Sequence, residues 1–276
     1  MDFCKGVNKV TLIVGWLACD QRRPCSAYIA SDSRISDNIN YYDNSQKLFA
    51  LKNTPDILGY CGETLFTYQI LARITDMCNT NKLFLQDLDY QDRSNIIFDE
   101  IKKKHARYNL NNNPIRIYHI GRNNQRLFET KRYVWNGKNW TNPAINTNYN
   151  KSMKLFVDGS GGSEFESCFK NYANGNNENT SRNYFHCFCD VIKNAKDRHT
   201  GGTPQLVGLY NGTKFNGMYH GTIIDGKAYY QALEVDDIYR MSDVRWYNEN
   251  FEICDWDTKQ RQSGAMIQPI SKKATP

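Results

Sequence analysis

The amino-acid sequence predicts an α+β fold, a four-layer α/β/β/α sandwich in which antiparallel sheets are covered by helix pairs. The predicted segments follow one another as strands, two helices, strands, two helices and strands. Because the helices come in pairs and do not alternate with single strands, this order disfavours a doubly wound parallel sheet. The 276 residues are 40% hydrophobic, which is ample for a sizeable core, and no internal repeat or linker divides them. One main domain is expected.

The first half of the chain opens with a predicted hairpin. Residues 10–18 are apolar and rich in β-branched side chains, as buried strands are, and the turn residues 20–24 lead to a returning strand at 26–31. The segments expected next are strands at 46–52 and 56–61, a helix that begins near Gly62 and carries Leu65, Ile70, Ile74 and Met77, and a helix at about 91–108.

The second half contains further predicted strands and a second pair of predicted helices. The expected segments are strands at 115–120, 126–135 and 153–158, helices at about 162–173 and 182–196, and strands at 205–210, 214–223 and 227–234. Residues 136–151 lack periodicity and predict a long loop or irregular hairpin. The polar residues 256–276 form a C-terminal tail that we expect to fray.

Composition narrows the classes of protein that the chain can represent. The net charge is only +6, and the short basic run Lys102–Lys104 is typical of a solvated helix face, so no nucleic-acid partner is expected. No stretch approaches the roughly 18 apolar residues of a membrane span, and the first residues lack the apolar core of a signal peptide. Nine scattered cysteines fit reduced thiols. We therefore expect a cytoplasmic protein that does not associate with membranes.

Metal and cofactor sites are not indicated by the sequence. Cys187 and Cys189 lie in a helical stretch with one residue between them, whereas zinc-binding cysteines are usually separated by two or more. The glycine-rich residues 159–162 lack both the lysine of a P-loop and the spacing of a dinucleotide fingerprint. The sequence therefore predicts no metal and no cofactor.

Five short motifs bring hydroxyl, acidic and basic side chains to the ends of predicted strands. In chain order they are Thr11 at the head of Thr-Leu-Ile-Val-Gly-Trp, Ser31-Asp32-Ser33-Arg34, Gln46-Lys47-Leu48-Phe49, Gly159-Ser160-Gly161-Gly162 and Asp197-Arg198-His199-Thr200-Gly201-Gly202. A hydroxyl is a poor nucleophile at neutral pH unless a base lies beside it. In this order, over about residues 11–225, the set resembles the active site of proteasome β-type subunits and bacterial proteasome-like N-terminal-nucleophile (Ntn) hydrolases.

The resemblance implies a role for each residue near the expected nucleophile. Thr11 is expected to attack the substrate, with its own freed α-amine as the base, and Lys47 to lie beside that amine, where a cation disfavours the charged form. Asp32 is expected to hold Lys47. Gly62, at a predicted helix start, is the candidate donor of the oxyanion-hole N–H, and Tyr60 and Cys61 are expected to line the substrate pocket.

Three further residues match the family in the second half of the chain. Ser160 corresponds to the serine that the family places near the amine of the nucleophile. Asp197 and Thr200 correspond to the Asp-x-x-Ser-Gly-Gly motif, in which Thr200 keeps the hydroxyl but not the residue type. The first hairpin is a few residues longer than is usual in the family, and such an insertion at a loop tip has a small entropic cost.

Ten residues precede Thr11 and decide whether it becomes an N-terminus. The resemblance predicts that residues 1–10 form a propeptide, that 11–255 form the Ntn hydrolase domain, and that 256–276 form the tail. Self-processing members of the family usually have glycine before the nucleophile, where this chain has Val10, and a β-branched residue resists the strained geometry of self-cleavage. Cys4 is the alternative nucleophile, but it does not begin a predicted strand.

The function expected from the resemblance is that of a threonine-type endopeptidase acting on a peptide or protein substrate. Exposure of Thr11 by autoprocessing would activate it, and the family implies a homo-oligomer, in the form of a ring. Two alternatives remain open at this point. One is an uncut, non-catalytic structural or regulatory subunit of the same fold, and the other is an Ntn amidase with a small-molecule substrate.

Overall fold

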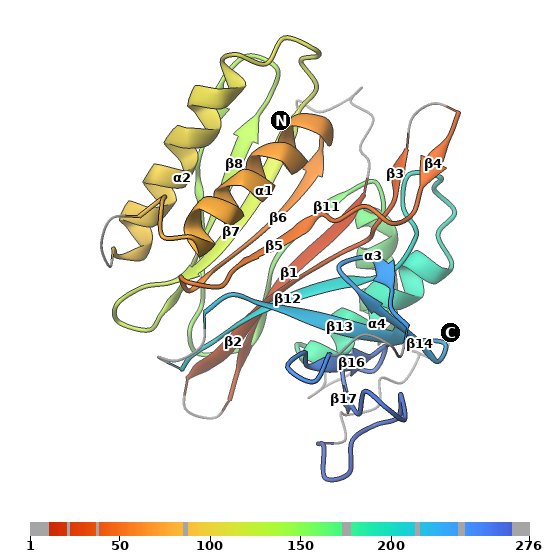
Figure 1. Ribbon diagram of the computed structural model, residues 1–276. Helices are drawn as coiled ribbons and strands as arrows, with labels where there is room; N and C mark the ends of the chain where they lie inside the picture. The colour runs from red at the N-terminus through yellow and green to blue at the C-terminus, as the bar shows by residue number, and fades with distance from the viewer. Residues whose placement is uncertain are drawn as a thin grey trace.

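A computed structural model describes residues 11–20, 23–36, 39–84, 88–172, 178–212, 216–236 and 241–266. In these ranges the protein is a mixed α+β structure with four α-helices and two large, almost entirely antiparallel sheets (Figure 1). The predicted α+β class, with antiparallel sheets and paired helices, is confirmed. None of the four helices in this part of the chain is both long enough and apolar enough to cross a membrane.

The first sheet contains the strand that follows Thr11. Its strands run in the order β11 (Met153–Gly159), β1 (Leu12–Cys19), β2 (Pro24–Ser31), β12 (Gln205–Tyr210), β13 (Met218–Ile224), β14 (Lys227–Tyr230) and β15 (Leu233–Glu234). β16 (Trp246–Asn248) pairs with β13 in parallel and with β17 (Ile253–Cys254) in antiparallel. Thus β1 lies between β2 and β11, and the residues at their ends meet next to Thr11.

The second sheet carries the lysine-bearing segment at one edge. Its strands run in the order β10 (Ala144–Ile145), β8 (Phe128–Trp135), β7 (Ile115–Arg122), β6 (Asp56–Gly62) and β5 (Leu48–Leu51), and β9 (Trp140–Thr141) pairs with β8. A separate small hairpin is formed by β3 (Ile35–Ser36) and β4 (Tyr41–Tyr42). Lys47 comes directly before β5.

The helices follow the strands in two pairs, α1 (Leu65–Asn79) with α2 (Tyr90–His105), and α3 (Gly162–Tyr172) with α4 (Ser181–Lys193). Helix ends leave backbone N–H groups without partners, and side chains satisfy some of them here. Glu63 accepts hydrogen bonds from the N–H groups of Leu65 and Phe66, and the Thr180 hydroxyl accepts one from Asn183. These contacts set where α1 and α4 begin.

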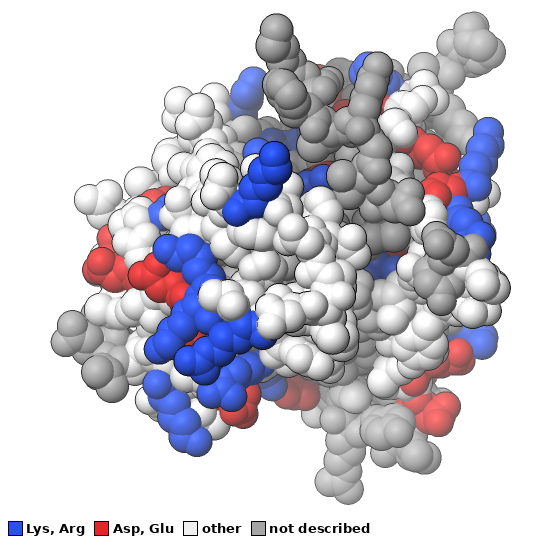
Figure 2. Space-filling view, turned by 90° about the horizontal axis from the view of Figure 1, so that it is seen from above, with Lys and Arg blue, Asp and Glu red and all other residues white. Residues whose placement is uncertain are grey.

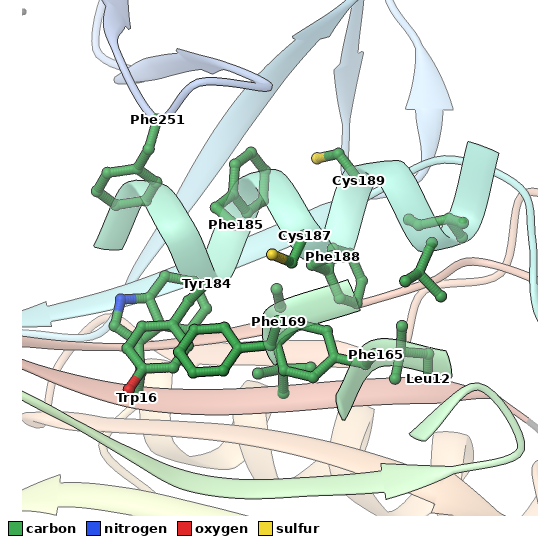
Figure 3. Packing of buried hydrophobic residues seen from close by; sticks show 14 of the residues in the cluster. Leu12, Trp16, Phe165, Phe169, Tyr184, Phe185, Cys187, Phe188, Cys189 and Phe251 are labelled. Carbon is green, nitrogen blue, oxygen red and sulfur yellow. The ribbon is translucent and has the colours of Figure 1, made fainter. Parts of the chain in front are cut away.

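Of the four hydrophobic clusters among the described residues, three pack the helices and sheets together. One packs α3 and α4 against the first sheet, and Figure 3 shows Tyr184 of α4 next to Trp16 of β1 and Phe165 of α3 next to Leu12. A second lies between the two sheets, and a third packs α1 and α2 against the second sheet. Figure 1 shows the same arrangement, with one helix pair on the outer side of each sheet. Each sheet is therefore buried on both faces, which explains the nearly continuous apolar runs of β1, β2 and β6.

Several details differ from the sequence predictions. The two-residue strands β3 and β4 and the short strands β16 and β17 were not predicted, and β9 and β10 occupy part of the expected loop at 136–151. In the expected tail, Arg261 forms an isolated β-bridge with Cys254, so the described part of the tail returns to β17. Residues 1–10, 213–215 and 267–276, which include the proposed propeptide and the end of the tail, lie outside the described residues.

Candidate active site

Thr11 is buried at the start of β1 in an unusual backbone conformation. The residue is 3% exposed, and its N–H donates to the His199 carbonyl at 3.0 Å. Its φ of +88° lies in a region that β-branched residues rarely adopt. Gly159 makes this close approach feasible, because a Cβ at that position would lie 2.0 Å from the Thr11 carbonyl oxygen. The last residue of β11 must therefore be glycine for the backbone of Thr11 to approach it this closely.

The side chain of Lys47 connects Thr11 with Asp32. Its Nζ lies 2.6 Å from Thr11 Oγ1 and 2.7 Å from Asp32 Oδ1, and it also donates to the Arg34 carbonyl. The side chains of Lys47 and Asp32 are both fully buried. Asp32 accepts two more hydrogen bonds, from the N–H of Leu12 at 3.2 Å and from the N–H of Gly201 at 3.0 Å. The structure therefore brings the predicted nucleophile, lysine and carboxylate together in one network.

Burial controls the proton equilibria of this pair. Removal from water lowers the pKa of Lys47, and the charge of Asp32 opposes that effect only in part. Removal from water likewise raises the pKa of Asp32 against the influence of Lys47. Both shifts favour the neutral form of each group. A neutral Lys47 amine has a lone pair that can accept the proton of the Thr11 hydroxyl, as a general base must.

The three second-half residues predicted to join the site form a hydroxyl chain beside the Thr11 backbone. Ser160 Oγ donates to the Thr11 carbonyl oxygen at 3.4 Å and lies 3.0 Å from Thr200 Oγ1. Thr200 Oγ1 in turn donates to Asp197 Oδ2 at 3.1 Å, while Asp197 Oδ1 accepts from the N–H of His199 at 3.1 Å. Asp197 therefore orients both a hydroxyl and the loop whose carbonyl holds the Thr11 nitrogen.

The structure places Gly62, Tyr60 and Cys61 along the last residues of β6. Gly62 has a φ of +102°, and a Cβ there would lie 2.3 Å from the Pro114 carbonyl oxygen, so the turn into α1 requires glycine. Tyr60 packs in the cluster that faces α1, whereas Cys61 packs between the sheets. The buried Cys61 thiol, whose pKa burial raises to about 12, interacts electrostatically with Lys47.

Three residues of the site were not given roles from the sequence. The Arg34 guanidinium binds Asp43 through two contacts, at 2.6 and 2.9 Å, and donates to the Thr200 carbonyl at 3.3 Å. His199 Nδ1 lies 2.7 Å from Ser36 Oγ. Gln205 bonds to the backbone of Lys47 and Asp32. Arg34 and His199 lie inside the motifs quoted above, so their place in the sequence indicated that they belong to the site. A lone glutamine at the start of a strand gives no such indication.

Thr11 does not line either of two cavities in the described part of the chain. One cavity of about 510 Å³ lies beside α4 and β14, and its lining reaches Gly202 and Thr203; another, of about 540 Å³, is lined by Arg93 and residues of the β5–β6 and β7–β8 turns. Figure 2 shows Lys and Arg side chains gathered on one side of the face seen from above, with acidic side chains next to them. On α2, Lys102 and Lys104 pair with acids one turn earlier.

Metal-binding geometry and known relatives give no further indication of function. Among the residues that the structure describes, no group of three or more His, Cys, Asp or Glu side chains is placed to hold a metal ion. Cys187 and Cys189 are buried in the cluster between α4 and the first sheet. Neither the protein-family models nor the curated proteins contain a match to this chain. What the site does is therefore inferred from the chemistry of Thr11, Lys47 and Asp32.

Proposed function

We propose that the protein is an N-terminal threonine peptidase of the Ntn-hydrolase type, in which Thr11 is the nucleophile. The observation that carries the proposal is the 2.6 Å contact between Lys47 Nζ and Thr11 Oγ1 inside a fully buried network that Asp32 completes. The base Lys47 lies within hydrogen-bond distance of both the nucleophile and the orienting carboxylate, which is the general arrangement of an activated hydroxyl. Burying a lysine has a large desolvation cost, which the contacts of Lys47 with Asp32, Thr11 and the Arg34 carbonyl offset.

The packing of the chain supports the same assignment. The order helix pair, sheet, sheet, helix pair, with one hydrophobic cluster at each boundary, is what a four-layer α/β/β/α sandwich of the Ntn type requires. The motifs that resemble proteasome β-type subunits lie at strand ends around Thr11. On this basis the substrate is a peptide or protein, and the working form is a homo-oligomer, such as a ring.

The first chemical step in the proposal is cleavage of the bond before Thr11. In the uncut chain the Thr11 nitrogen is an amide and has no basic lone pair, so Lys47 takes the proton of Oγ1. Oγ1 bonds to the carbonyl carbon of Val10, the C–N bond breaks, and the proton passes to the departing nitrogen. Breaking that bond frees the α-amine of Thr11. Water then hydrolyses the ester between Oγ1 and Val10, which regenerates the Thr11 hydroxyl and releases residues 1–10. Val10 and the alternative nucleophile Cys4 lie outside the described residues.

Peptide hydrolysis follows the same pattern with a substrate carbonyl in place of Val10. The freed amine starts from the position where the Thr11 N–H now bonds to the His199 carbonyl, close to the Ser160–Thr200 hydroxyls. Thr11 Oγ1 attacks the carbonyl while the amine, next to Lys47, takes the proton. The Gly62 N–H is the proposed donor to the oxyanion. Loss of the amine product leaves an acyl-enzyme, which water activated by the same amine hydrolyses.

Intact mass spectrometry of the purified full-length chain tests this function. The wild-type protein is expected to lose residues 1–10 and the Thr11→Ala variant to keep them, with Thr11→Ser as the matched control that retains a hydroxyl. A peptide-based covalent inhibitor of threonine peptidases should label Thr11. A chain that stays at full mass in its native assembly would support the non-catalytic alternative, and hydrolysis of small amides without labelling by the peptide probe would support the amidase.

A further inference from the structure

Gln205, the first residue of β12, uses its whole side-chain amide within the site. Its Oε1 accepts a hydrogen bond from the Lys47 N–H at 3.0 Å. Its Nε2 donates to the Asp32 carbonyl at 3.0 Å and to the Ser45 carbonyl at 3.0 Å. The residue is 4% exposed. An amide is the neutral side chain that offers both an acceptor and two donors, so it satisfies all three backbone groups at once.

These three contacts join segments that belong to different sheets. Asp32 follows β2 of the first sheet, which is hydrogen-bonded to β12 through Ser31 and Gln205. Ser45 and Lys47 belong to the segment that enters β5 of the second sheet. Gln205 therefore ties the backbone on both sides of the Lys47–Asp32 contact. Loss of the amide would leave buried backbone groups without partners, which is costly and would allow the two segments to move relative to each other.

We propose that Gln205 is a positioning residue, which holds the backbone of Lys47 and Asp32 so that Lys47 Nζ stays against Thr11 Oγ1. Its side chain contacts backbone atoms and not Thr11, so it acts through Lys47. The inference rests on the proposed function for its catalytic meaning, although the geometry that it describes does not depend on catalysis.

The charges around Lys47 make a substitution of one atom informative. Asp32 after β2, Cys61 on β6 and Asp43 after β4 act on the pKa of Lys47 and raise it, against the lowering effect of burial. Gln205→Glu keeps the shape of the side chain but replaces the donor nitrogen with oxygen. At neutral pH it also adds a negative charge to this set of acids, which favours the ammonium form of Lys47.

Carbon-13 NMR of protein labelled at lysine Cε tests the inference on the full chain, with the Lys47 signal assigned from its absence in Lys47→Arg. Gln205→Glu is expected to raise the pKa of Lys47 by about one unit, as a nearby charge does. Gln125→Glu, the same change on the exposed β7–β8 turn, is the matched control and should leave it unchanged. Gln205→Met, which removes the hydrogen bonds without adding charge, is expected to lower kcat about tenfold with little change in KM.

The outcomes separate this inference from the proposed function. An unchanged Lys47 pKa in folded Gln205→Glu would overturn the positioning role, as would a wild-type kcat in Gln205→Met. If Gln205→Glu does not fold, the Gln205→Met kinetics decide. If the wild-type chain hydrolyses no peptide but the Lys47 pKa responds to Gln205→Glu, the contact of Gln205 with the Lys47 segment stands and the peptidase assignment fails. If peptides are cleaved and neither variant has an effect, the peptidase assignment stands and the positioning role of Gln205 fails.

Discussion

Asp32 and Asp56 are both fully buried acids that contact a buried cationic side chain, but their surroundings shift their pKa values in opposite directions. Asp32 pairs with Lys47, and burial raises its pKa. Asp56 contacts Arg93 Nε at 2.6 Å and His119 Nε2 at 2.8 Å; burial acts to raise its pKa as well, but these two partners outweigh burial and hold it at about 2. The two acids lie at opposite ends of the β5–β6 hairpin, since Leu51 pairs with Asp56 and Lys47 precedes the other end.

Asp32 and Asp56 differ in the type of cationic side chain that each contacts and in the other partners of that side chain. Arg93 stays protonated at any ordinary pH, and its donors are shared among Asp56 and the carbonyls of Leu88 and Arg122. Lys47 is a base whose pKa burial lowers, and besides Asp32 it contacts the Arg34 carbonyl and the Thr11 hydroxyl. The Asp56–Arg93 pair therefore keeps its protonation states, whereas the Asp32–Lys47 pair is able to exchange a proton. A buried ion pair suggests catalysis only when a titratable partner reaches a nucleophile.

The substitution Lys47→Arg should have the largest effect, and it separates charge from basicity. The guanidinium keeps a positive charge beside Asp32 but does not act as a base for the proposed cleavage before Thr11. Without that cleavage the α-amine is not freed, so peptide hydrolysis is expected to fall about a thousandfold at every pH. Because the charge remains paired, the free energy of unfolding should fall less than in Lys47→Ala. Steady-state kinetics and urea denaturation measure the two effects. Activity above one tenth of wild type in Lys47→Arg would remove the distinction between the two pairs.

The substitution Arg93→Ala should produce the opposite outcome at the other pair. It leaves Asp56 buried without its main cation, which is expected to lower the free energy of unfolding by about 3–5 kcal/mol. Hydrolysis per folded molecule, measured well below the unfolding temperature, should be unchanged because Arg93 does not contact the site. A matched Arg107→Ala variant, at an exposed position just after α2, controls for loss of an arginine. A fall in kcat for folded Arg93→Ala would show that the two regions are coupled.

Acid should destabilise the chain through the Asp56 pair. The pKa of Asp56 is about 2 in the folded state against 3.8 when unperturbed, so its contribution to stability is fully present above pH 3.8 and is lost as pH falls towards 2. The contribution is about 2 kcal/mol. The pKa of His119 is lowered chiefly by burial, so its neutral form adds stability that is lost as pH falls below 6.5. Urea unfolding from pH 7 to 2 should show a shallower decline in Asp56→Asn, and equal slopes would refute this assignment.

The smallest expected effect concerns the hydroxyl that lies beyond His119. Tyr133 OH lies 2.7 Å from His119 Nδ1 and 2.9 Å from Ser94 Oγ, all in buried surroundings. Tyr133→Phe keeps the ring and removes these bonds, so the free energy of unfolding should fall by about 1–2 kcal/mol. Peptide hydrolysis should not change. Thermal and urea unfolding with activity assays on the same samples measure both, and a loss of activity would contradict a purely structural role for this network.

Local sequence patterns predicted the long elements because their periodicity comes from burial against a neighbour. The apolar runs of β1, β2 and β6 and the spacing in α1 to α4 were sufficient for this. The strands β3, β4, β16 and β17 have two or three residues each, and their pairing depends on tertiary neighbours and not on a local pattern. The same reason explains why residues 136–151 gave no strand prediction.

The residues of the site were predictable where burial of a charged side chain requires a partner of opposite charge. A lysine and an acid in apolar strands are costly to bury unless they pair. The order of the motifs, in its resemblance to proteasome β-type subunits, indicated that Lys47 and Asp32 would meet near Thr11. Gln205 was not predictable, because its role comes from a contact with Lys47 that spans 158 residues and two sheets. The separation of Tyr60 and Cys61 onto opposite faces of β6 depends on the register of that strand, which sequence alone constrains weakly.

The left-handed backbone of Thr11 has a thermodynamic consequence of its own. The torsion φ of a residue exists only while its nitrogen is bonded to a preceding carbonyl carbon, so cutting that bond abolishes the strained angle instead of relaxing it. A conformation of this kind stores about 1–3 kcal/mol. Its disappearance would multiply the equilibrium constant for cleavage by a factor of about 5 to 150, and would oppose religation equally. If the proposed cleavage takes place, release of residues 1–10 would therefore be difficult to reverse.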